Sequence, residues 1–424
     1  MNSKPALDLT DAQARDRSHP LRDFRERFHI SDPDVIYLDG NSLGRLPKAA
    51  RNRVEHVVSH EWGDRLIRSW GESWFDASER LGEKLAPLIG VASGQVIFSD
   101  STSVNLYKLV LAALEARAPR KKIVTDELNF PSDLYILEGA VRLWGRGAIV
   151  NVVPAMPDGI CANVDAIINA IDHDTALVTL SHVAFKSGFL YDAVRITEAA
   201  HAKGALVLWD LSHSVGAVPV DLDGWRADLA VGCSYKYLNG GPGAPAFLYV
   251  RKDLQDRLTS PIWGWFGRDR PFSFDLSYTP VAGMRRFTVG TPPVLSLLGL
   301  EPGLDVFAEA GMEKISQASV ALTSYLIELI DERLAPRGFT LASPRDSALR
   351  GSHVTIAHED AYRISTAMVD RGVIPDFREP NGIRLGIAPL YVSHEDIWVG
   401  VDRITKIIDQ RLQEQYPKER SAVT

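Results

Sequence analysis

The sequence predicts an α/β protein whose large domain carries a mostly parallel sheet flanked by helices. Apolar segments of strand length alternate with amphipathic segments of helix length between residues 95 and 250. This alternation is typical of a parallel sheet covered on both faces. An aromatic- and glycine-rich loop then interrupts the pattern, which resumes near residue 303 as a smaller α/β unit. We therefore expect an N-terminal segment (1–48) packing with the small domain, a large domain (49–302) and a small C-terminal domain (303–424).

The composition of the chain limits the kinds of binding partner and the cellular location that we expect. The chain has 424 residues, with 47 Lys and Arg against 54 Asp and Glu, so its formal net charge is −7. That balance argues against nucleic acid or an anionic membrane as a partner. Only Cys161 and Cys233 are present, which provides neither a disulfide framework nor a zinc spacing. We expect no metal site and a cytoplasmic location, since the N-terminal stretch also lacks the apolar core of a signal peptide.

The elements of the first 250 residues follow from hydrophobic periodicity. After a polar lead-in we expect helices near 20–28, over 48–89 with a break at Gly71, from Thr102, from Ser132, and over 164–171 and 191–203. Strands are expected at 35–38, 95–98, 122–125, 149–153, 176–183, 205–209, 229–233 and 246–250. No GxGxxG follows the first strand of the alternating region, so a dinucleotide-binding fold has no local support.

The C-terminal unit shows the same alternation on a smaller scale. A long helix is expected over 303–334 with an interruption near Gly311. Strands are then expected at 340–342, 354–356, 374–377 and 383–385, with helices at 362–371 and 395–416.

The stretch VGCSYKYLNGGPG places Lys236 between an apolar strand and a glycine-rich turn. Burial by the strand lowers the pKa of a lysine, so that its neutral amine can attack a carbonyl. The carbonyl most often served in this way is the aldehyde of pyridoxal phosphate, PLP. Taken alone, Lys236 is equally consistent with a surface lysine that follows a strand.

A second stretch, ALVLWDLSHSVGA, ends an apolar strand in Asp210 and continues to His213. A carboxylate in such a place can keep a buried pyridinium nitrogen protonated. Because ligands bind at the carboxyl ends of parallel strands, we expect Asp210 and Lys236 in one crevice. We expect His213 in the same site because it shares a turn with Asp210. The alternatives are a helix-capping aspartate and a core histidine.

Eight segments together carry a resemblance to one family, the kynureninases. They are YLDGNSLG (37–44), LIRSW (66–70), NFPSD (129–133), WDLSHSVGA (209–217), SYKYLNGGPG (234–243), GWFG (264–267), GTPPVLSL (290–297) and GIRLGIAPLY (382–391). The chain resembles bacterial-type kynureninases, PLP enzymes of the aspartate-aminotransferase-like fold type I. The resemblance implies PLP binding by the large domain and a homodimer with active sites at the interface.

The resemblance also implies the cofactor contacts. Phe130 is expected to stack on the pyridine ring, and Asp133 to lie on the side of its phenolic oxygen. A helix start is a natural phosphate site, although serine and threonine also cap helices there. Trp265 is expected to reach the phosphate in the partner subunit, with Thr291 in a neighbouring role. The full set of implied cofactor contacts is Thr102, Ser103, Phe130, Pro131, Ser132, Asp133, Ser181, Asp210, His213, Tyr235, Lys236, Trp265 and Thr291.

For the substrate, the resemblance implies that Arg384 clamps the α-carboxylate, a role that suits the bidentate guanidinium. Arg378 is a rival on the same segment, and a surface salt bridge is the plainer alternative for either arginine. The 37–44 segment, with Asn41, is expected to form a substrate wall, although it could be only a tight turn.

The implied reaction is hydrolysis of L-kynurenine, or its 3-hydroxy form, to anthranilate or 3-hydroxyanthranilate and L-alanine in tryptophan breakdown. Lys236 moves the α-proton, Asp210 supports the ring, and Tyr235 assists proton transfer at the γ-carbonyl. Two alternatives stay open. A cysteine desulfurase-like lyase needs a nucleophilic cysteine on a mobile loop, which neither cysteine provides. A non-catalytic PLP-fold protein is disfavoured by the intact Lys236, Asp210 and Arg384.

Overall fold

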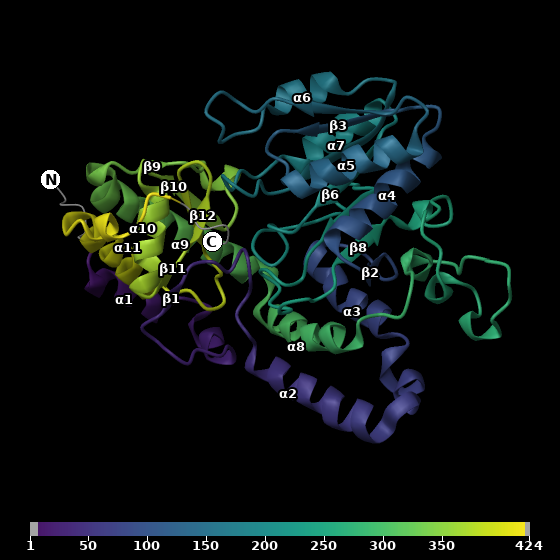
Figure 1. Cartoon of the computed structure of the whole chain (residues 1–424), viewed down its shortest axis with the longest axis horizontal. Helices are drawn as coiled ribbons and strands as arrows, with labels where there is room; N and C mark the ends of the chain where they lie inside the picture. Colours follow the sequence, from purple (N-terminus) through teal and green to yellow (C-terminus); the bar gives the residue numbers. More distant parts are fainter. Residues whose placement is uncertain (1–6, 420–424) are drawn as a thin grey trace.

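The structure is a computed structural model that describes residues 7–419. It has two lobes, a large one on the right and a smaller one on the left of Figure 1. The large lobe surrounds the main sheet, and the small lobe contains the C-terminal strands together with the N-terminal segment. Among the described residues, no helix is both long and apolar enough to cross a bilayer.

The main sheet is mostly parallel, as predicted. Within the described residues it has seven strands in the order β2-β8-β7-β6-β5-β3-β4. The four pairs from β7 to β4 are parallel, and β8 is antiparallel to both of its neighbours. The strands are β2 (Val96–Phe98), β3 (Lys122–Asp126), β4 (Ile149–Val153), β5 (Thr175–Ser181), β6 (Leu206–Asp210), β7 (Leu229–Gly232) and β8 (Phe247–Val250).

Helices cover both faces of this sheet because successive strand residues point to opposite sides. Ile123 and Leu208 pack with helices α4 and α5, whereas Val124 and Trp209 pack on the opposite face with α6, α7 and α8. Both sets are fully buried. The helices of this lobe are α2 (Lys48–His56), α3 (Ala77–Leu85), α4 (Thr102–Ala116), α5 (Pro131–Trp144), α6 (Val164–Ala170), α7 (Ala193–Ala202) and α8 (Val294–Ala310).

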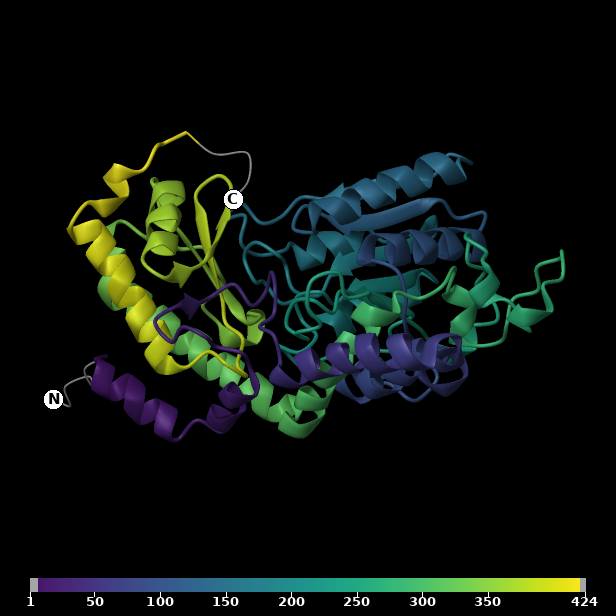
Figure 2. The ribbon, with the colours of Figure 1, turned by 60° about the horizontal axis from the view of Figure 1, so that its bottom comes forward.

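The small lobe holds an antiparallel sheet in the order β12-β13-β10-β9 and a two-stranded pair, β1 with β11. Because β1 comes from the N-terminal segment, that segment is part of this lobe's packing, and α1 lies along α11 (Figure 2). The strands are β1 (Ile36–Tyr37), β9 (Thr340–Leu341), β10 (His353–Ala357), β11 (Val373–Ile374), β12 (Asp376–Arg378) and β13 (Gly382–Gly386). The helices are α1 (Leu9–Arg17), α9 (Met312–Leu329), α10 (Ala361–Asp370) and α11 (His394–Asp409).

Several elements differ from the expectation. The segment expected as a helix near 20–28 is the 3₁₀ turn Arg22–Arg27, and the strand expected over 374–377 is two strands of different sheets, β11 and β12. The polar lead-in contains α1, capped by Asp8, whose side chain accepts from the Asp11 amide at 2.9 Å. Helix α8 begins at Val294, nine residues early, although Pro302 lies inside it. Its glycines allow close packing, since a Cβ at Gly303 would lie 2.6 Å from the Leu238 carbonyl. The expected 48–89 helix instead continues beyond α2 as wide π turns and short 3₁₀ turns over 57–74.

Candidate active site

The predicted residues meet at the carboxyl edge of the main sheet. Asp210 is the last residue of β6, Ser181 is the last residue of β5, and the two lie side by side in register. Lys236 follows β7 by four residues, in the adjacent position along the sheet. Parallel strands with their helices place ligands at this edge. The expectation that Asp210 and Lys236 share one crevice therefore matches the geometry.

Lys236 is in direct contact with His213. Its Nζ lies 2.8 Å from His213 Nε2. Burial, followed by the charge of Lys236, holds the pKa of His213 well below its usual range, so the ring is neutral. Nε2 then accepts from the lysine, and the ring proton lies on Nδ1. Within residues 7–419 this buried Nδ1 has no hydrogen-bond partner. An unpaired buried donor beside a lysine favours a bound group at this place.

Two carboxyl groups lie next to Lys236. Asp210 accepts from the Ser212 amide at 2.8 Å and from Ser212 Oγ at 2.6 Å. Burial raises the pKa of Asp210, against the Ser212 hydrogen bond and the charge of Lys236. Burial also raises the pKa of the neighbouring Asp133, and the charge of Asp210 raises it further. A cationic N–H group bound at Asp210 would favour the charged form of that carboxyl, and a pyridinium nitrogen provides such a group.

Two helix starts converge beside the same crevice. Thr102 is the first residue of α4 and Pro131 is the first residue of α5. Ser103 Oγ lies 3.3 Å from Ser132 Oγ, so the hydroxyls of both first turns meet. Helix N-termini with free N–H groups bind phosphate. The Phe130 side chain, just before α5, is 37% exposed, and its ring centroid is 5.8 Å from Lys236 Nζ. Lysine, carboxyls, an aromatic face and an anion site therefore fit PLP together.

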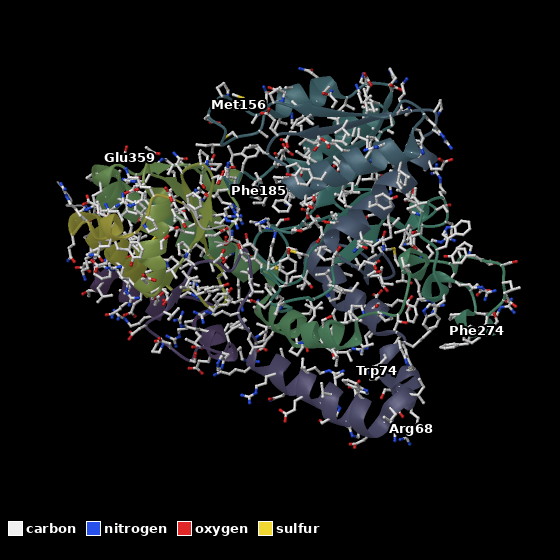
Figure 3. All side chains as sticks on the ribbon, in the orientation of Figure 1. Arg68, Trp74, Met156, Phe185, Phe274 and Glu359 are labelled. Atoms are coloured by element: carbon white, nitrogen blue, oxygen red, sulfur yellow. The ribbon has the colours of Figure 1, made fainter. Side chains whose placement is uncertain are left out.

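Arg384 brings the small lobe into the site. It lies on β13 with its side chain 1% exposed and donates from Nη1 to the Phe185 carbonyl at 2.6 Å. Phe185 lies at the junction of the two lobes (Figure 3). The Phe185 ring is in turn 5.2 Å from the Phe130 ring, centroid to centroid. Arg384 is thus linked to the residue that flanks Lys236.

Arg384 also donates from Nη2 to Ser42 Oγ at 2.8 Å and forms an ion pair with Asp376. Arg378 shares that carboxylate at 2.7 Å, but its side chain is 34% exposed. The burial and the link to Phe130 favour Arg384 over its rival as the carboxylate clamp. Within the described part of the chain, Arg384 Nε has no hydrogen-bond partner, so the guanidinium keeps a free donor.

Asn41 is fully buried behind the clamp. Neither atom of its side-chain amide has a hydrogen-bond partner among the described residues. The amide lies against Gly386, where an added Cβ would be 1.8 Å from Asn41 Oδ1. A buried amide without partners is costly unless another group completes it. This arrangement is consistent with a substrate wall and does not have the exposure of a plain surface turn.

Of the remaining predicted residues, Tyr235 lies next to Lys236, with its ring centroid 5.9 Å from Lys236 Nζ. Ser181 Oγ donates to Asn129 Oδ1 at 2.7 Å and faces that side chain. Tyr235 and Thr291 line a cavity of ≈ 470 Å³ together with Ser101 at the start of α4. Trp265, in a 3₁₀ turn, meets the Phe272 ring at 5.8 Å and has no contact in the structure with Lys236.

Comparison with known proteins decides the family. Residues 315–404 match the model of the kynureninase C-terminal domain. The kynureninase of Pseudomonas fluorescens is 45% identical over 406 residues, which covers 95% of each chain. That of Burkholderia pseudomallei strain K96243 is 43% identical over 407 residues, covering 94% of this chain and 95% of the relative. The chain belongs to the kynureninase family.

Solved structures agree on the fold. The apo cysteine desulfurase from Thermococcus onnurineus NA1 aligns with a TM-score of 0.76 and 18% identity over 92% of this chain and 98% of that chain. The Escherichia coli cysteine desulfurase CsdA aligns with a TM-score of 0.77 and 19% identity over the same shares. The fold of this kynureninase-family chain is therefore PLP fold type I, as expected from the sequence.

Neither cysteine of the chain is suited to desulfurase chemistry. Cys233 is fully buried under Ser212, and burial raises the pKa of its thiol. Cys161 is half-buried in the stretch before α6, where burial and Asp158 raise its pKa as well. A nucleophilic cysteine needs a lowered pKa and access. The desulfurase alternative therefore has less support than the kynureninase assignment.

Several residues at the site were not anticipated from the sequence. Asp376 is the cross-strand partner of Arg384 in β12, His353 packs its ring 5.5 Å from that of His213, and Phe185 links the clamp to Phe130. The only local signal was the charge pattern around Asp376, which is two residues before Arg378. The other contacts join segments more than 50 residues apart.

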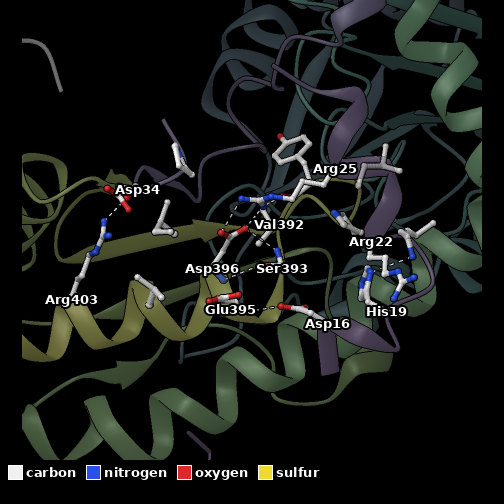
Figure 4. Close-up of a pocket in the computed structure, with 17 residues that line it drawn as sticks. Asp16, His19, Arg22, Arg25, Asp34, Val392, Ser393, Glu395, Asp396 and Arg403 are labelled. Atoms are coloured by element: carbon white, nitrogen blue, oxygen red, sulfur yellow. Dashed lines mark hydrogen bonds and ion pairs between the residues drawn. The ribbon is translucent and has the colours of Figure 1, made fainter. Parts of the chain in front are cut away.

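A separate cavity of ≈ 460 Å³ lies between the N-terminal segment and the start of α11 (Figure 4). Its charges are largely paired with one another: Arg25 binds Asp396, and Asp16 accepts from His394 Nδ1 at 2.8 Å. None of the predicted site residues lines it. These pairs hold the N-terminal segment against α11, and the cavity is separate from the Lys236 site.

Proposed function

We propose that this member of the kynureninase family hydrolyses the Cβ–Cγ bond of L-kynurenine, giving anthranilate and L-alanine with PLP as cofactor. It is a hydrolase acting on a carbon–carbon bond of a ketone. The observation that carries the proposal is the Lys236–His213 contact, with Asp210 close enough to feel the charge of Lys236 and His213 close enough to feel that of the buried Arg384. Together they supply an amine, a ring partner and a carboxylate clamp at one place.

The cofactor, when bound, supplies a conjugated ring that takes up negative charge from the substrate's α-carbon. Asp210 would keep the ring nitrogen protonated, and Phe130 would stack on the ring. Thr102, Ser103, Ser132 and the two helix starts would hold the phosphate. Ser181, Pro131 and Asp133 would complete the surroundings of the ring.

The chain's own groups bind the substrate and move its protons. Arg384 binds the α-carboxylate, and Asn41 forms the wall behind it. Lys236 takes the proton from the α-carbon, and His213 accepts a hydrogen bond from its amine. Tyr235 holds a proton at the γ-carbonyl oxygen while water adds to that carbon. The Cβ–Cγ bond then breaks, and the acyl carbon becomes the carboxylate of anthranilate. Cβ takes a proton to become the methyl group of alanine, and the α-carbon regains the proton that Lys236 removed.

We further propose a homodimer whose sites include Trp265 from the partner subunit. Exposed aromatic side chains on the 263–276 loop support this, including Trp263, Phe272 and Phe274. The loop projects from the end of the large lobe, with Phe274 at its tip (Figure 3).

We also propose that the chain divides at residues 48 and 302 into an N-terminal segment, a PLP-binding domain and a C-terminal domain. We also propose a cytoplasmic location, with which the two free cysteines agree.

The test is the reaction itself. Purified protein supplied with PLP and L-kynurenine should release anthranilate, seen by its fluorescence, and alanine in equal amounts. Parallel assays with 3-hydroxy-L-kynurenine would identify the preferred substrate, and assays with L-cysteine would test the desulfurase alternative. Absence of an aminobenzoate product from either kynurenine would contradict the proposal, as would alanine formed from cysteine alone.

A further inference from the structure

Lys108 is a fully buried lysine that the proposed mechanism does not use. It lies in the second turn of α4, six residues after the helix begins, and its side chain has no exposed surface. A lysine is almost never buried in this way unless its charge is paired. Burial lowers the pKa of Lys108, and the charge of Asp100 opposes that shift. Its partners therefore indicate why the chain keeps a charge here.

The first partner is Asp100, in the junction between β2 and α4. Lys108 Nζ donates to Asp100 Oδ2 at 2.8 Å, and Ser99 Oγ donates to the same oxygen at 2.7 Å. Asp100 has a left-handed backbone with φ +51°, a conformation that is uncommon for a residue with a side chain. The Ala246 amide donates to its carbonyl at 2.9 Å. The carboxylate is thus fixed just before the residues expected to bind phosphate.

The second partner is the backbone of a distant segment. Lys108 Nζ donates to the Phe287 carbonyl at 2.6 Å. Phe287 is fully buried at the end of the 3₁₀ turn Met284–Phe287, and the segment 288–293, which contains Thr291, follows at once. Thr288 to Pro293 line the ≈ 470 Å³ cavity on one side, and Asp100, Ser101 and Tyr235 line it elsewhere. Lys108 therefore connects Asp100 and the 288–293 segment, which both line that cavity.

We propose that Lys108 is a positioning residue that holds the 288–293 segment against the start of α4 and so sets the affinity of the site for the cofactor's phosphate. The proposal rests on the proposed function, since it assumes that PLP binds at the start of α4. Lys108 acts through Asp100 and Phe287 and touches neither cofactor nor substrate. Loss of the ammonium leaves the Phe287 carbonyl and the Asp100 carboxylate without their shared donor. The backbone near Asp100 and in the 288–293 segment should therefore become more mobile.

A matched control exists at the opposite end of the sheet. Lys122, at the start of β3, is also buried, donates to the Ala170 carbonyl at 2.8 Å and pairs with Asp172. It has the same kinds of partner as Lys108, but it lies at the amino end of the parallel strands, away from the site. Replacing either lysine removes a buried ammonium bound to one carboxylate and one carbonyl.

The experiment compares Lys108→Met and Lys122→Met with the wild type in two measurements. The first is the dissociation constant of PLP, titrated into the apo-protein by quenching of tryptophan fluorescence. The second is amide hydrogen exchange of the peptide covering residues 285–293 in the apo-protein. We expect Lys108→Met to raise the dissociation constant about tenfold and to speed exchange in that peptide. Lys122→Met should lower the melting temperature without changing either quantity.

Equal dissociation constants for the wild type and Lys108→Met would overturn the inference, as would equal changes in both variants. If Lys108→Met does not fold, Asp100→Asn tests the same link, because it keeps the side-chain shape and weakens the hold on the ammonium. Its dissociation constant should rise in the same direction, and an unchanged value would also overturn the inference. A wild type that binds no PLP would instead refute the proposed function, so the two failures are distinguishable.

Discussion

At the scale of single residues, the carboxylate clamp is a compact group of opposite charges. Arg384 and Arg378 share the carboxylate of Asp376, and Arg384 also binds Ser42 and the Phe185 carbonyl. Only Arg384 is almost completely buried. The Arg384 guanidinium is already paired with one carboxylate and keeps a free Nε–H. It is therefore well suited to bind a second carboxylate, that of a substrate, by donating a hydrogen bond to it.

The two arginines should therefore differ strongly when truncated. Arg384→Ala should cost about 2–5 kcal/mol in substrate binding, because it strands charges that the clamp normally pairs. The KM for kynurenine should rise steeply, while PLP still binds to Lys236 and gives a borohydride-sensitive absorbance band. Arg378→Ala, at a more exposed position, is the control and should have a much smaller effect on KM. The reverse order in steady-state kinetics would reassign the clamp to Arg378.

Asp39 should make the binding of the substrate carboxylate at Arg384 depend on pH. Burial raises the pKa of Asp39 to about 6, with Asp376 adding to the rise and the Ser42 hydrogen bond, Arg384 and Arg378 opposing it. Above that pH the charged carboxylate repels a substrate carboxylate held at Arg384, and below it the repulsion is absent. The KM should therefore rise about 2- to 10-fold as pH increases through 6.

Asp39→Asn should keep the low-pH KM over the whole range. The ratio of wild-type to variant KM, measured from pH 5 to 8, cancels the titration of the substrate itself. The neighbouring His213 and His353 do not add a transition in this window, because burial lowers the pKa of both well below the usual value. A ratio that does not change with pH would show that Asp39 does not act on the clamp.

The residues of the site differ in how far sequence alone could locate them. Lys236, Asp210 and His213 lie in short motifs at strand ends, so their proximity followed from sheet topology. Phe185 acts through a contact between the lobes, since Arg384 reaches its carbonyl from 199 positions away in the chain, whereas Asp376 meets Arg384 across the β12–β13 pair of the small lobe. Periodicity and spacing carry no information about such pairings, which depend on how the two lobes pack.

At the scale of elements, the hydroxyl groups at the starts of α4 and α5 have different roles, one in helix capping and the others in the proposed phosphate site. Ser101 is the N-cap of α4, and its Oγ accepts from the Val104 amide at 3.4 Å. Ser103 points instead to Ser132 at the start of α5. The first serine stabilises the helix, and the second faces the neighbouring helix where a phosphate would bind.

Replacing each of the two serines with alanine should have a different effect. Ser103→Ala should weaken PLP binding about tenfold by removing a hydroxyl from the phosphate site, with little change in melting temperature. Ser101→Ala should lower stability by about 0.5–2 kcal/mol through loss of the cap, with a smaller effect on PLP affinity. Fluorescence titration and thermal unfolding of both variants check this. A loss of affinity confined to Ser101→Ala would exchange the two roles.

Elements with strong periodicity were predictable, and those shaped by packing were not. The alternating strands and helices of the large lobe occur close to the expected positions. Helix α8 was placed too late because Pro302 and the glycines around it have low helix propensity, yet Gly299 and Gly303 permit close contact with Val54 and Leu238. The tertiary contact outweighs the local preference there.

At the scale of the whole molecule, the proposed dimer predicts that each active site uses two chains. Trp265 belongs to the aromatic-rich loop, where its ring meets those of Phe266 and Phe272. If Trp265 serves the partner's site, a mixed dimer of Lys236→Ala and Trp265→Ala chains has one intact site.

Each variant alone should have low activity, and dissociation followed by reassociation of the mixture should restore about a quarter of wild-type activity. Half of the randomly reassembled dimers are mixed, and each has one intact site of two. Sedimentation before and after mixing provides the control for assembly. No recovery of activity, or an active monomer, would place Trp265 within its own chain's site or outside the site altogether.

The central claim is that Lys236 is the residue to which PLP attaches, and one measurement tests it directly. Protein incubated with PLP is reduced with borohydride, digested and analysed by mass spectrometry. The account predicts a single phosphopyridoxyl group on the peptide that contains Lys236, absent in Lys236→Ala. A stable adduct on another lysine, or no adduct in a folded wild-type protein, would contradict it.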